Sequence, residues 1–188
     1  LVLFAVNLAS WNEVEGFISA GQDAYQALKY CEVPVVAAST GMCLGGGAEI
    51  LLHCDAIQAH SESYIGLVEV GVGIVPAWGG CKELLARLNK FNLVPEGPMG
   101  AAMKAFEYIG TAKVATSAEQ ARSMGFLGPD DGITMNRDRL LADAKERALE
   151  MIDGYEPPEP HTYVLPGDSG FTALELAVKD LALSGQAT

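Results

Sequence analysis

The chain has 188 residues, of which 49% are apolar and 19% charged, and its 12 Lys and Arg against 24 Asp and Glu give a formal net charge of −12. A chain of this length can bury about 70% of its extended surface in one core, and its apolar content argues against intrinsic disorder. The acidic balance argues against a nucleic-acid partner, because neutralising phosphates requires clustered Lys and Arg.

The chain begins without a methionine. Leu1–Ala9 is apolar but lacks the basic start of a signal peptide, and we expect Leu1 to be a cut edge of a longer polypeptide. The longest uncharged run, Val33–Ala48, contains four glycines and is too short to span a bilayer. We therefore expect no membrane insertion.

The predicted elements begin with a helix. Glu13–Cys31 has apolar residues at three- and four-residue spacings, which is typical of an amphipathic helix: Val14, Phe17, Ile18, Ala24, Tyr25 and Leu28. Val33–Ala38 is apolar on both faces and predicts a fully buried strand. The glycine-rich segment Ser39–Gly47 follows it. Next come a short apolar helix and two strands, predicted at Ala48–Cys54, Asp55–His60 and Ser63–Gly66.

The second half of the chain is predicted to be mostly helical. The helical patterns lie at Ala77–Leu88, at Met99–Ile109, between the N-cap motif Thr116–Glu119 and Gly125, and at Arg137–Asp153. Trp78-Gly79-Gly80 is expected to open the first of these helices and Asn136 to cap the last, after an extended segment at Asp131–Met135. The apolar stripe of the last helix consists of Leu140, Leu141, Ala144, Ala148 and Met151.

The C-terminal part divides into a linker and a helix. Gly154–Gly170 contains four prolines and is a linker by composition. Phe171–Leu183 has an amphipathic helical pattern, with an apolar stripe made by Leu174, Leu176, Ala177, Val178 and Leu181. We expect a core at residues 1–153, followed by a linker and helix of the same domain at 154–188. Strand–helix–strand order with helices accumulating toward the end favours the α/β class.

The cysteines and histidines form no recognisable reactive group. Four widely spaced cysteines without a CxxC pair predict buried free thiols in a reducing cytoplasm rather than disulfides or a metal site. They are Cys31, Cys43, Cys54 and Cys81. Of the three histidines, His53 lies beside Cys54, but adjacent helical residues point about 100° apart, which disfavours a Cys–His dyad. His60 and His161 have no nucleophile beside them.

A glycine triplet, Gly45–Gly47, lies between a predicted strand and a predicted helix. Without side chains its backbone N–H groups can converge on an anion or oxyanion, and a ligand can approach the main chain closely. No Gly-Lys-Ser/Thr follows, so it is not a phosphate-binding P-loop, and no GxGxxG dinucleotide motif is present. Tight turn packing explains the triplet equally well.

Two glutamates stand alone in apolar surroundings. Glu49 is the only charge between Glu32 and Asp55, and Glu69 is the only charge in Ile65–Ala77. A buried carboxylate is costly without a partner or a purpose. Two such carboxylates beside glycine-rich turns favour acid–base work on a substrate held by an oxyanion hole. Alternatively, each glutamate caps a helix or pairs with an arginine.

Three stretches resemble the crotonase superfamily, and enoyl-CoA hydratases in particular: Val33–Glu49 (VPVVAASTGMCLGGGAE), Asp55 and Ile65–Leu85 (IGLVEVGVGIVPAWGGCKELL). The family pattern has a strand, a GGG turn, a glutamate, a second glutamate twenty residues on, and a proline and GG pair that open a helix. The resemblance implies a crotonase-like (ClpP/crotonase) ββα superhelix with C-terminal helices. Because the family's first strands would precede Leu1, we expect the core to be N-terminally incomplete.

The resemblance also implies residue roles. Glu49 and Glu69 match the two catalytic glutamates, and Gly46 matches the glycine whose N–H supplies one oxyanion-hole donor, the second donor being expected upstream. In the implied syn addition of water to trans-2-enoyl-CoA, Glu49 activates the water and Glu69 delivers the Cα proton, giving 3-hydroxyacyl-CoA. The residues expected to line the substrate are Leu44, Gly45, Val68, Pro76 and Trp78.

A narrower resemblance concerns Leu67–Gly73 and Thr116–Lys145, which are similar to the hydratase portion of fused 3-hydroxyacyl-CoA dehydrogenases of fatty-acid β-oxidation. It implies an upstream dehydrogenase region that binds NAD, whereas this chain itself would hold no cofactor and no metal. It further implies an enoyl-CoA thioester as substrate, a cytoplasmic enzyme and a homo-oligomer, a trimer being typical of the superfamily.

Some positions depart from the family pattern, and other functions stay open. Val68 stands where many hydratases have proline, and Trp78 stands where a small residue is common, which predicts a narrower pocket or a shifted Glu69. Lys82 is a candidate phosphate contact for CoA or a solvated helix lysine. The alternatives to a hydratase are a Δ3,Δ2-enoyl-CoA isomerase, which can use the Glu69-type residue alone, and an acyl-CoA-binding or assembly module that is inactive as it stands.

Overall fold

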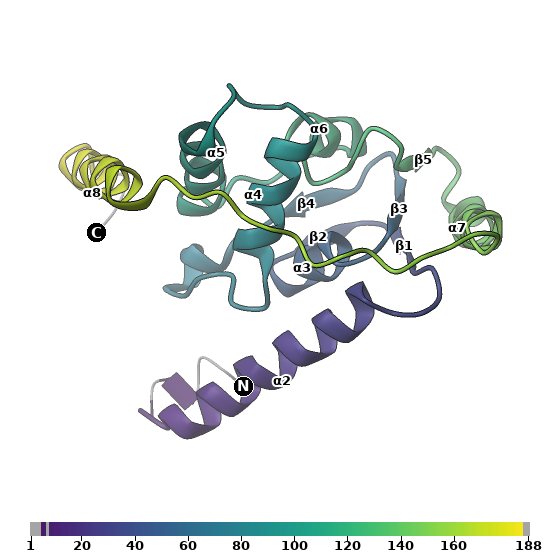
Figure 1. Cartoon of the computed structure of the whole chain (residues 1–188), viewed down its shortest axis with the longest axis horizontal. Coiled ribbons are helices and arrows are strands. Elements are labelled where there is room, and N and C mark those ends of the chain that lie inside the picture. The colour runs from purple at the N-terminus through teal and green to yellow at the C-terminus, as the bar shows by residue number, and fades with distance from the viewer. Residues whose placement is uncertain (1–4, 7, 186–188) are drawn as a thin grey trace.

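The computed structural model describes residues 5, 6 and 8–185, and Figure 1 labels their helices and strands. Leu1, the expected cut edge, lies outside these residues. The strands are β1 (Val36–Ser39), β2 (Met42–Leu44), β3 (Ala56–His60), β4 (Tyr64–Gly66) and β5 (Gly132–Thr134). The helices are α2 (Trp11–Lys29), α3 (Gly46–Leu52), α4 (Gly80–Lys90), α5 (Pro98–Gly110), α6 (Ala118–Ser123), α7 (Leu140–Glu150) and α8 (Gly167–Leu183), with 3-10 turns η1 (Glu69–Val72) and η2 (Arg137–Arg139).

The strands form two small parallel sheets. One has the order β1-β3-β5, and the other pairs β2 with β4. Val36 lies opposite Ala56 in the first sheet, and Met42 lies opposite Tyr64 in the second. Parallel pairing needs a crossover connection, and here the unit β1–β2–α3 is followed by the unit β3–β4–α4, each strand pairing with its counterpart. This repeat is the ββα superhelix that the resemblance to the crotonase superfamily implied.

The core lies between the strands and the helices α3 to α6. Ile57 on β3, Ile65 on β4, Leu84 on α4 and Phe126 after α6 are fully buried and belong to one apolar cluster. Helix α4 packs against α3 and α5, α6 packs against β4, and α7 packs against β1 and β3. Ser117 caps α6 as expected, its hydroxyl accepting the Gln120 N–H at 3.1 Å.

Two predictions about the first strands are wrong. β1 begins at Val36 rather than at Val33, and it is not fully buried, because Ala37 packs against the core whereas Ala38 is exposed. Side chains alternate between the faces of a strand, so burying both requires cover on both. The sequence also fails to predict β2, which is only three residues long and lies within the glycine-rich segment.

The long helix predicted at Arg137–Asp153 is shorter in the structure. Asn136 caps the 3-10 turn η2 by accepting the Asp138 N–H at 3.0 Å, and α7 begins only at Leu140. Leu140 is 5% exposed but Leu141 is 75% exposed. Neighbouring residues of a helix point about 100° apart, so the predicted stripe could not bury both leucines against one partner.

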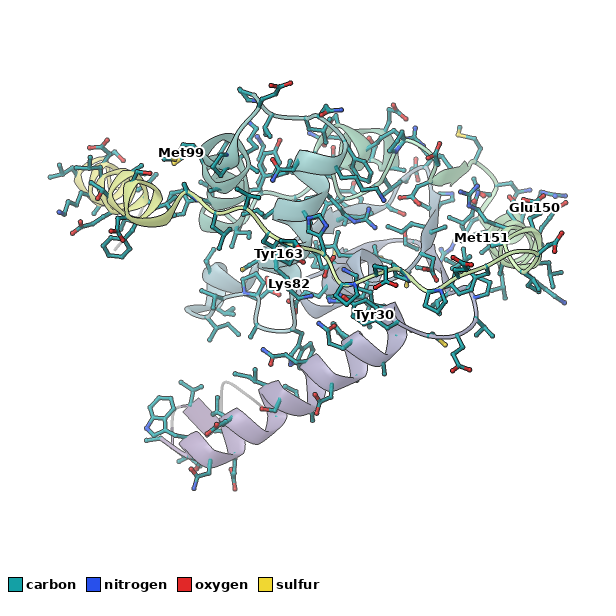
Figure 2. All side chains as sticks on the ribbon, viewed as in Figure 1. Tyr30, Lys82, Met99, Glu150, Met151 and Tyr163 are labelled. Carbon is teal, nitrogen blue, oxygen red and sulfur yellow. The ribbon has the colours of Figure 1, made fainter. Side chains whose placement is uncertain are left out.

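The proline-rich linker runs across the molecule from α7 toward α8 (Figure 1). Near its start, the Tyr155 hydroxyl donates to Asp55 Oδ1 at 3.0 Å. Farther along, Tyr163 lies near Tyr30 at the end of α2 (Figure 2), and burial, followed by the charge of Glu83, raises the pKa of Tyr163 to about 12. The linker is therefore attached to the elements it crosses.

Helix α8 lies at the periphery and begins at Gly167, within the segment predicted as linker. It packs against α5 (Figure 1). Two residues of its predicted apolar stripe, Leu176 and Val178, are 56% and 47% exposed, so the described residues leave much of that stripe uncovered. None of the helices described in this structure is long and apolar enough to cross a membrane.

The four cysteines are free, but the prediction that all of them are buried is wrong. Cys54 is buried, Cys31 and Cys43 are half-buried, and Cys81 is exposed. Cys31 and Cys81 lie next to helix ends, where a residue has fewer neighbours to cover it.

Helix α2 is joined to the rest of the molecule by one face. Phe17, Gly21 and Tyr25 recur every four residues along that face and all contact the indole of Trp78. The Phe17 and Tyr25 rings lie 5.2 and 5.4 Å from the Trp78 ring centroid. Gly21 packs so closely on the indole that a Cβ atom there would overlap it.

Two polar contacts extend this attachment. Gln22 Nε2 donates to the Ala77 carbonyl at 2.8 Å, and Lys29, in the last turn of α2, forms an ion pair with Glu83 at 2.7 Å. No residue of α2 is fully buried. The helix therefore depends on this one face for its position, as Figure 1 shows where α2 lies along one side of the body.

Gly21→Ala and Gly16→Ala form a matched pair that tests this attachment. Both glycines lie within α2, where alanine favours the helix by up to about 1 kcal/mol, but a Cβ on Gly16 meets nothing within 4 Å. We expect Gly16→Ala to raise the melting temperature. Gly21→Ala should lower it, because the added methyl group overpacks the contact with the indole and reduces the free energy of unfolding by about 1–3 kcal/mol. The fluorescence of Trp78 should shift to the red in the Gly21→Ala variant. Equal melting temperatures for the two variants would contradict the docking of Gly21 on Trp78.

Candidate active site

The short helix α3 places Glu49 inside the protein. The turn before it is closed by Gly45, whose φ of +57° favours glycine, and the Gly45 carbonyl accepts the Glu49 N–H at 3.0 Å. The Glu49 side chain points toward the start of α4, and its Oε1 accepts the N–H groups of Trp78 at 3.0 Å and Gly80 at 2.8 Å. Glu49 is only 2% exposed, so these two N–H groups provide the polar contacts that the buried carboxylate requires.

The glycine pair before α4 is explained by the same contact. Gly79 has a φ of +117°, and a Cβ atom on Gly80 would lie 3.0 Å from Glu49 Oε1 and 2.8 Å from Leu67 Cδ2. Only a residue without a side chain lets the Gly80 N–H approach the carboxylate this closely. The predicted opening of the helix by Trp78-Gly79-Gly80 is thus nearly correct, since α4 begins at Gly80.

Glu69 has a different environment. It is the first residue of η1, and both of its carboxylate oxygens are buried without a hydrogen-bond partner among the described residues. Its Oε1 would lie 3.2 Å from a Cβ atom on Gly45, so the side chain faces the glycine turn. Burial is the main cause of a raised pKa for Glu69, and the nearby backbone N–H groups of Glu69 and Val68, which lie outside hydrogen-bonding geometry, act in the opposite direction.

The structure brings the two glutamates together. Burial is the main cause of a raised pKa for Glu49, and the negative charge of Glu69 adds to it, while the N–H groups of Gly80 and Trp78 act in the opposite direction. No ion pair to either carboxylate occurs in the described part of the chain. The arginine alternative is therefore wrong for these residues, whereas Glu49 does contact the start of a helix.

The glycine turn lies between the two carboxylates because of the β2–β4 pair. Leu44 ends β2 opposite Gly66 of β4, and the Gly45 N–H donates to the Gly66 carbonyl at 2.9 Å. Glu69 follows β4 after two residues. Gly46 is the first residue of α3, so its N–H has no acceptor within the helix and can donate to another group.

Aromatic side chains close one side of the turn. Trp78 Cζ3 would lie 2.9 Å from a Cβ atom on Gly46, so the indole covers this glycine directly. The Tyr25 hydroxyl donates to the Gly46 carbonyl at 3.0 Å. Sequence reasoning placed Phe17 and Tyr25 on the apolar face of a helix but did not connect them with the site, because a four-residue spacing identifies a face and not its partner.

The other predicted lining residues flank these elements. Val68 is the N-cap residue of η1 and immediately precedes Glu69. Pro76 is buried in the turn before α4, and its carbonyl accepts the Cys81 thiol at 3.4 Å. The turn that carries Pro76 also contains Trp78, so Val68, Pro76 and Trp78 occupy two turns, one next to Glu69 and one bonded to Glu49.

No sequence pattern connected His53 with the site, yet its ring lies behind Glu49. Its Nδ1 is 2.7 Å from the Glu49 carbonyl, and burial lowers the pKa of the imidazole. The disfavoured dyad is not formed, because the Cys54 thiol donates to the Ile50 carbonyl at 3.4 Å. Lys82, the candidate phosphate contact, donates to Glu83 at 2.6 Å.

Residues 7–93 match the family described as enoyl-CoA hydratase/isomerase. A probable 3-hydroxyacyl-CoA dehydrogenase of Bacillus subtilis is 44% identical over 188 residues, which is 98% of this chain but 23% of that protein. A crotonyl-CoA hydratase of Syntrophomonas wolfei is 39% identical over 83 residues, covering 44% of this chain and 32% of the relative. The chain thus spans less than a third of the length of either relative.

Solved structures agree with the fold. An enoyl-CoA hydratase from Bacillus anthracis matches with a TM-score of 0.59 and 27% identity over 74% of this chain and 48% of that one. An enoyl-CoA hydratase/isomerase from Cupriavidus metallidurans matches with a TM-score of 0.63 over 81% of this chain and 52% of that one, and at 20% identity it supports the fold alone. With the ββα superhelix and these matches together, the chain belongs to the crotonase superfamily of enoyl-CoA hydratases and isomerases.

Proposed function

We propose that this site hydrates trans-2-enoyl-CoA thioesters to 3-hydroxyacyl-CoA. The observation that carries the proposal is the pair of buried carboxylates facing the glycine turn. Glu49 is held by two N–H groups, and Glu69 has no hydrogen-bond partner in residues 5, 6 and 8–185. Gly46, between them, offers an N–H that no helical acceptor uses. This is the set of groups that hydration of a thioester-conjugated double bond requires: a base, an acid and an oxyanion donor.

The proposed reaction divides the work between the two glutamates. Water adds its oxygen to Cβ while Glu49 takes a proton from it, and Glu69 supplies the proton that bonds to Cα. The thioester oxygen, on which negative charge develops, accepts the Gly46 N–H. The pKa values of both carboxyl groups are raised, which favours a pair that retains a proton, as a division into an acid and a base requires. Because the carboxyl groups interact, their protonation belongs to the pair rather than to either residue.

We also propose that this unit works within a multifunctional 3-hydroxyacyl-CoA dehydrogenase of fatty-acid β-oxidation. Support comes from the 44% identity that extends along 98% of this chain to the Bacillus subtilis protein of that name. In this proposal NAD binds to the dehydrogenase region, no residue of this chain contacts it, and the enzyme is a cytoplasmic homo-oligomer.

A Δ3,Δ2-enoyl-CoA isomerase is the second candidate. The matched family includes isomerases. The observation in favour of this candidate is the Glu69 carboxyl group, which has no hydrogen bond within the described part of the chain and could carry a proton between two carbons of the acyl chain without Glu49. The fixed position of Glu49 favours hydration, because an isomerase of this kind has no use for a second carboxylate.

Glu49→Gln tests the hydratase assignment. The amide oxygen of glutamine can still accept the N–H groups of Trp78 and Gly80, so the fold is expected to persist while the base is lost. We expect hydration of crotonyl-CoA, followed as loss of thioester-conjugation absorbance, to fall by about 10²–10⁴-fold. Glu62→Gln, at an exposed position, is the control and should hydrate like the wild type.

Three other outcomes would identify a different function. Hydration retained in the Glu49→Gln variant would exclude Glu49 as the base. Conversion of a 3-enoyl-CoA to its conjugated isomer by that variant, without hydration by the wild type, would support the isomerase. Calorimetric binding of an acyl-CoA by a wild-type chain that turns over neither substrate would support a binding or assembly module.

Glu69→Gln tests the environment of the acid through stability. The pKa of Glu69 is raised in the folded state, so the folded protein binds more protons than the unfolded chain between the unfolded and folded pKa values. The free energy of unfolding therefore falls as pH rises through that window. In denaturant titrations we expect Glu69→Gln to gain stability relative to the wild type as pH rises. A difference in free energy of unfolding that does not change with pH would contradict the burial of a carboxylate that has no partner among the described residues.

A further inference from the structure

Three consecutive glycines form the turn at the site, and they cannot hold it in place by side-chain packing. A Cβ atom on Gly47 would meet nothing within 4 Å, and glycine has the greatest backbone freedom of any residue. A fixed orientation of these peptides therefore depends on hydrogen bonds and on what packs over them. The Gly45 N–H is bonded to Gly66, and the Gly45 carbonyl to the Glu49 N–H.

Tyr25 supplies the side-chain contact to this turn. Its hydroxyl comes from α2, 21 residues earlier in the chain, and donates to the Gly46 carbonyl at 3.0 Å. The phenol ring is itself held on two sides. Its centroid lies 5.4 Å from that of Trp78, edge to face, and 5.3 Å from that of His53.

Both ring neighbours of Tyr25 are also bonded to Glu49. Trp78 donates its backbone N–H to the carboxylate, and His53 Nδ1 lies 2.7 Å from the Glu49 carbonyl. Tyr25 thus contacts the glycine turn and the two residues that surround Glu49. A hydroxyl bonded to a peptide carbonyl restrains the peptide plane and polarises it, here the plane that joins Gly46 to Gly47.

We propose that Tyr25 is a positioning residue that fixes the Gly46–Gly47 peptide and thereby the backbone of Gly46, whose N–H belongs to the preceding peptide, an inference that rests on the proposed function. The hydroxyl acts on the transition state through Gly46 and does not touch the substrate. Burial, then the charges of Glu49 and Glu69, raise the pKa of Tyr25 to about 12. The phenol consequently stays protonated, and remains a donor, across the pH range in which the two carboxyl groups titrate.

Tyr25→Phe removes the hydroxyl and keeps the ring, so packing against Trp78 is expected to persist. Hydrogen exchange followed by mass spectrometry should show faster exchange in the peptide that spans residues 42–52. In crotonyl-CoA hydration we expect kcat to fall about tenfold, the loss of roughly one hydrogen bond. KM should stay within about twofold, because the lost interaction acts in the transition state.

Tyr64→Phe is the matched control, since Tyr64 is 42% exposed and its hydroxyl has no hydrogen bond within the described residues. The Tyr25→Phe deficit should be the same at about pH 6 and pH 9, because a hydroxyl with a pKa of about 12 does not titrate there. A deficit that changes with pH would overturn positioning in favour of proton transfer. A change in KM alone would overturn it in favour of substrate contact.

The exchange measurement separates this inference from the function on which it rests. A wild-type chain that does not hydrate crotonyl-CoA would contradict the proposed function, and the exchange rates of residues 42–52 would still test whether Tyr25 holds the turn. Unchanged exchange in Tyr25→Phe would overturn the positioning role, with or without activity. Faster exchange together with an unchanged kcat would show that the hydrogen bond has no part in the reaction, and would overturn the proposal as well.

Discussion

The buried carboxylate of Glu49 accepts two backbone N–H groups, and the segments around the site are arranged so that it can. The donors, Trp78 and Gly80, lie 29 and 31 residues farther along the chain. Because an unpaired buried carboxylate would cost several kcal/mol, α3 and the turn before α4 must meet at hydrogen-bonding distance. That requirement explains Gly80, where a Cβ atom would crowd both Glu49 and Leu67. It also explains why Trp78 is fixed through its backbone.

The fixed Trp78 in turn provides the surface on which α2 docks. The indole is packed between Gly21 on the helix and Gly46 on the turn. Trp78, whose N–H orients the Glu49 carboxylate, therefore also determines where the neighbouring helix lies. Tyr25 takes its position from the same ring. Glu69 shows the opposite arrangement, because its carboxyl group is buried without a compensating partner among the described residues. Such unfavourable burial is characteristic of functional sites, where a reactive group is held in a state that stability alone would not select.

Much of this could be predicted from the sequence, for specific reasons. Glu49 and Glu69 were identifiable because isolated charges in apolar stretches are costly and therefore informative. The cap at Ser117 was identifiable because its signal is local. The predicted burial of Val33–Ala38 was wrong, since an apolar strand does not reveal whether both of its faces are covered. The predicted burial of Leu141 was wrong for a similar reason, because hydrophobic periodicity identifies the apolar face of a helix but not how much of that face the neighbouring elements cover.

The sequence by itself determined the α/β class, the order of the elements, the two carboxylates and the glycine turn, because these follow from charge, hydrophobic period and the need for residues without side chains. Only the tertiary structure decided that Glu49 accepts from Trp78 and Gly80, that Glu69 has no hydrogen-bond partner among the described residues, and that Tyr25 bonds the glycine turn. The reason is physical. These contacts join residues 21 to 31 positions apart, and their distances depend on how one ββα unit stacks on the next, which no local pattern records.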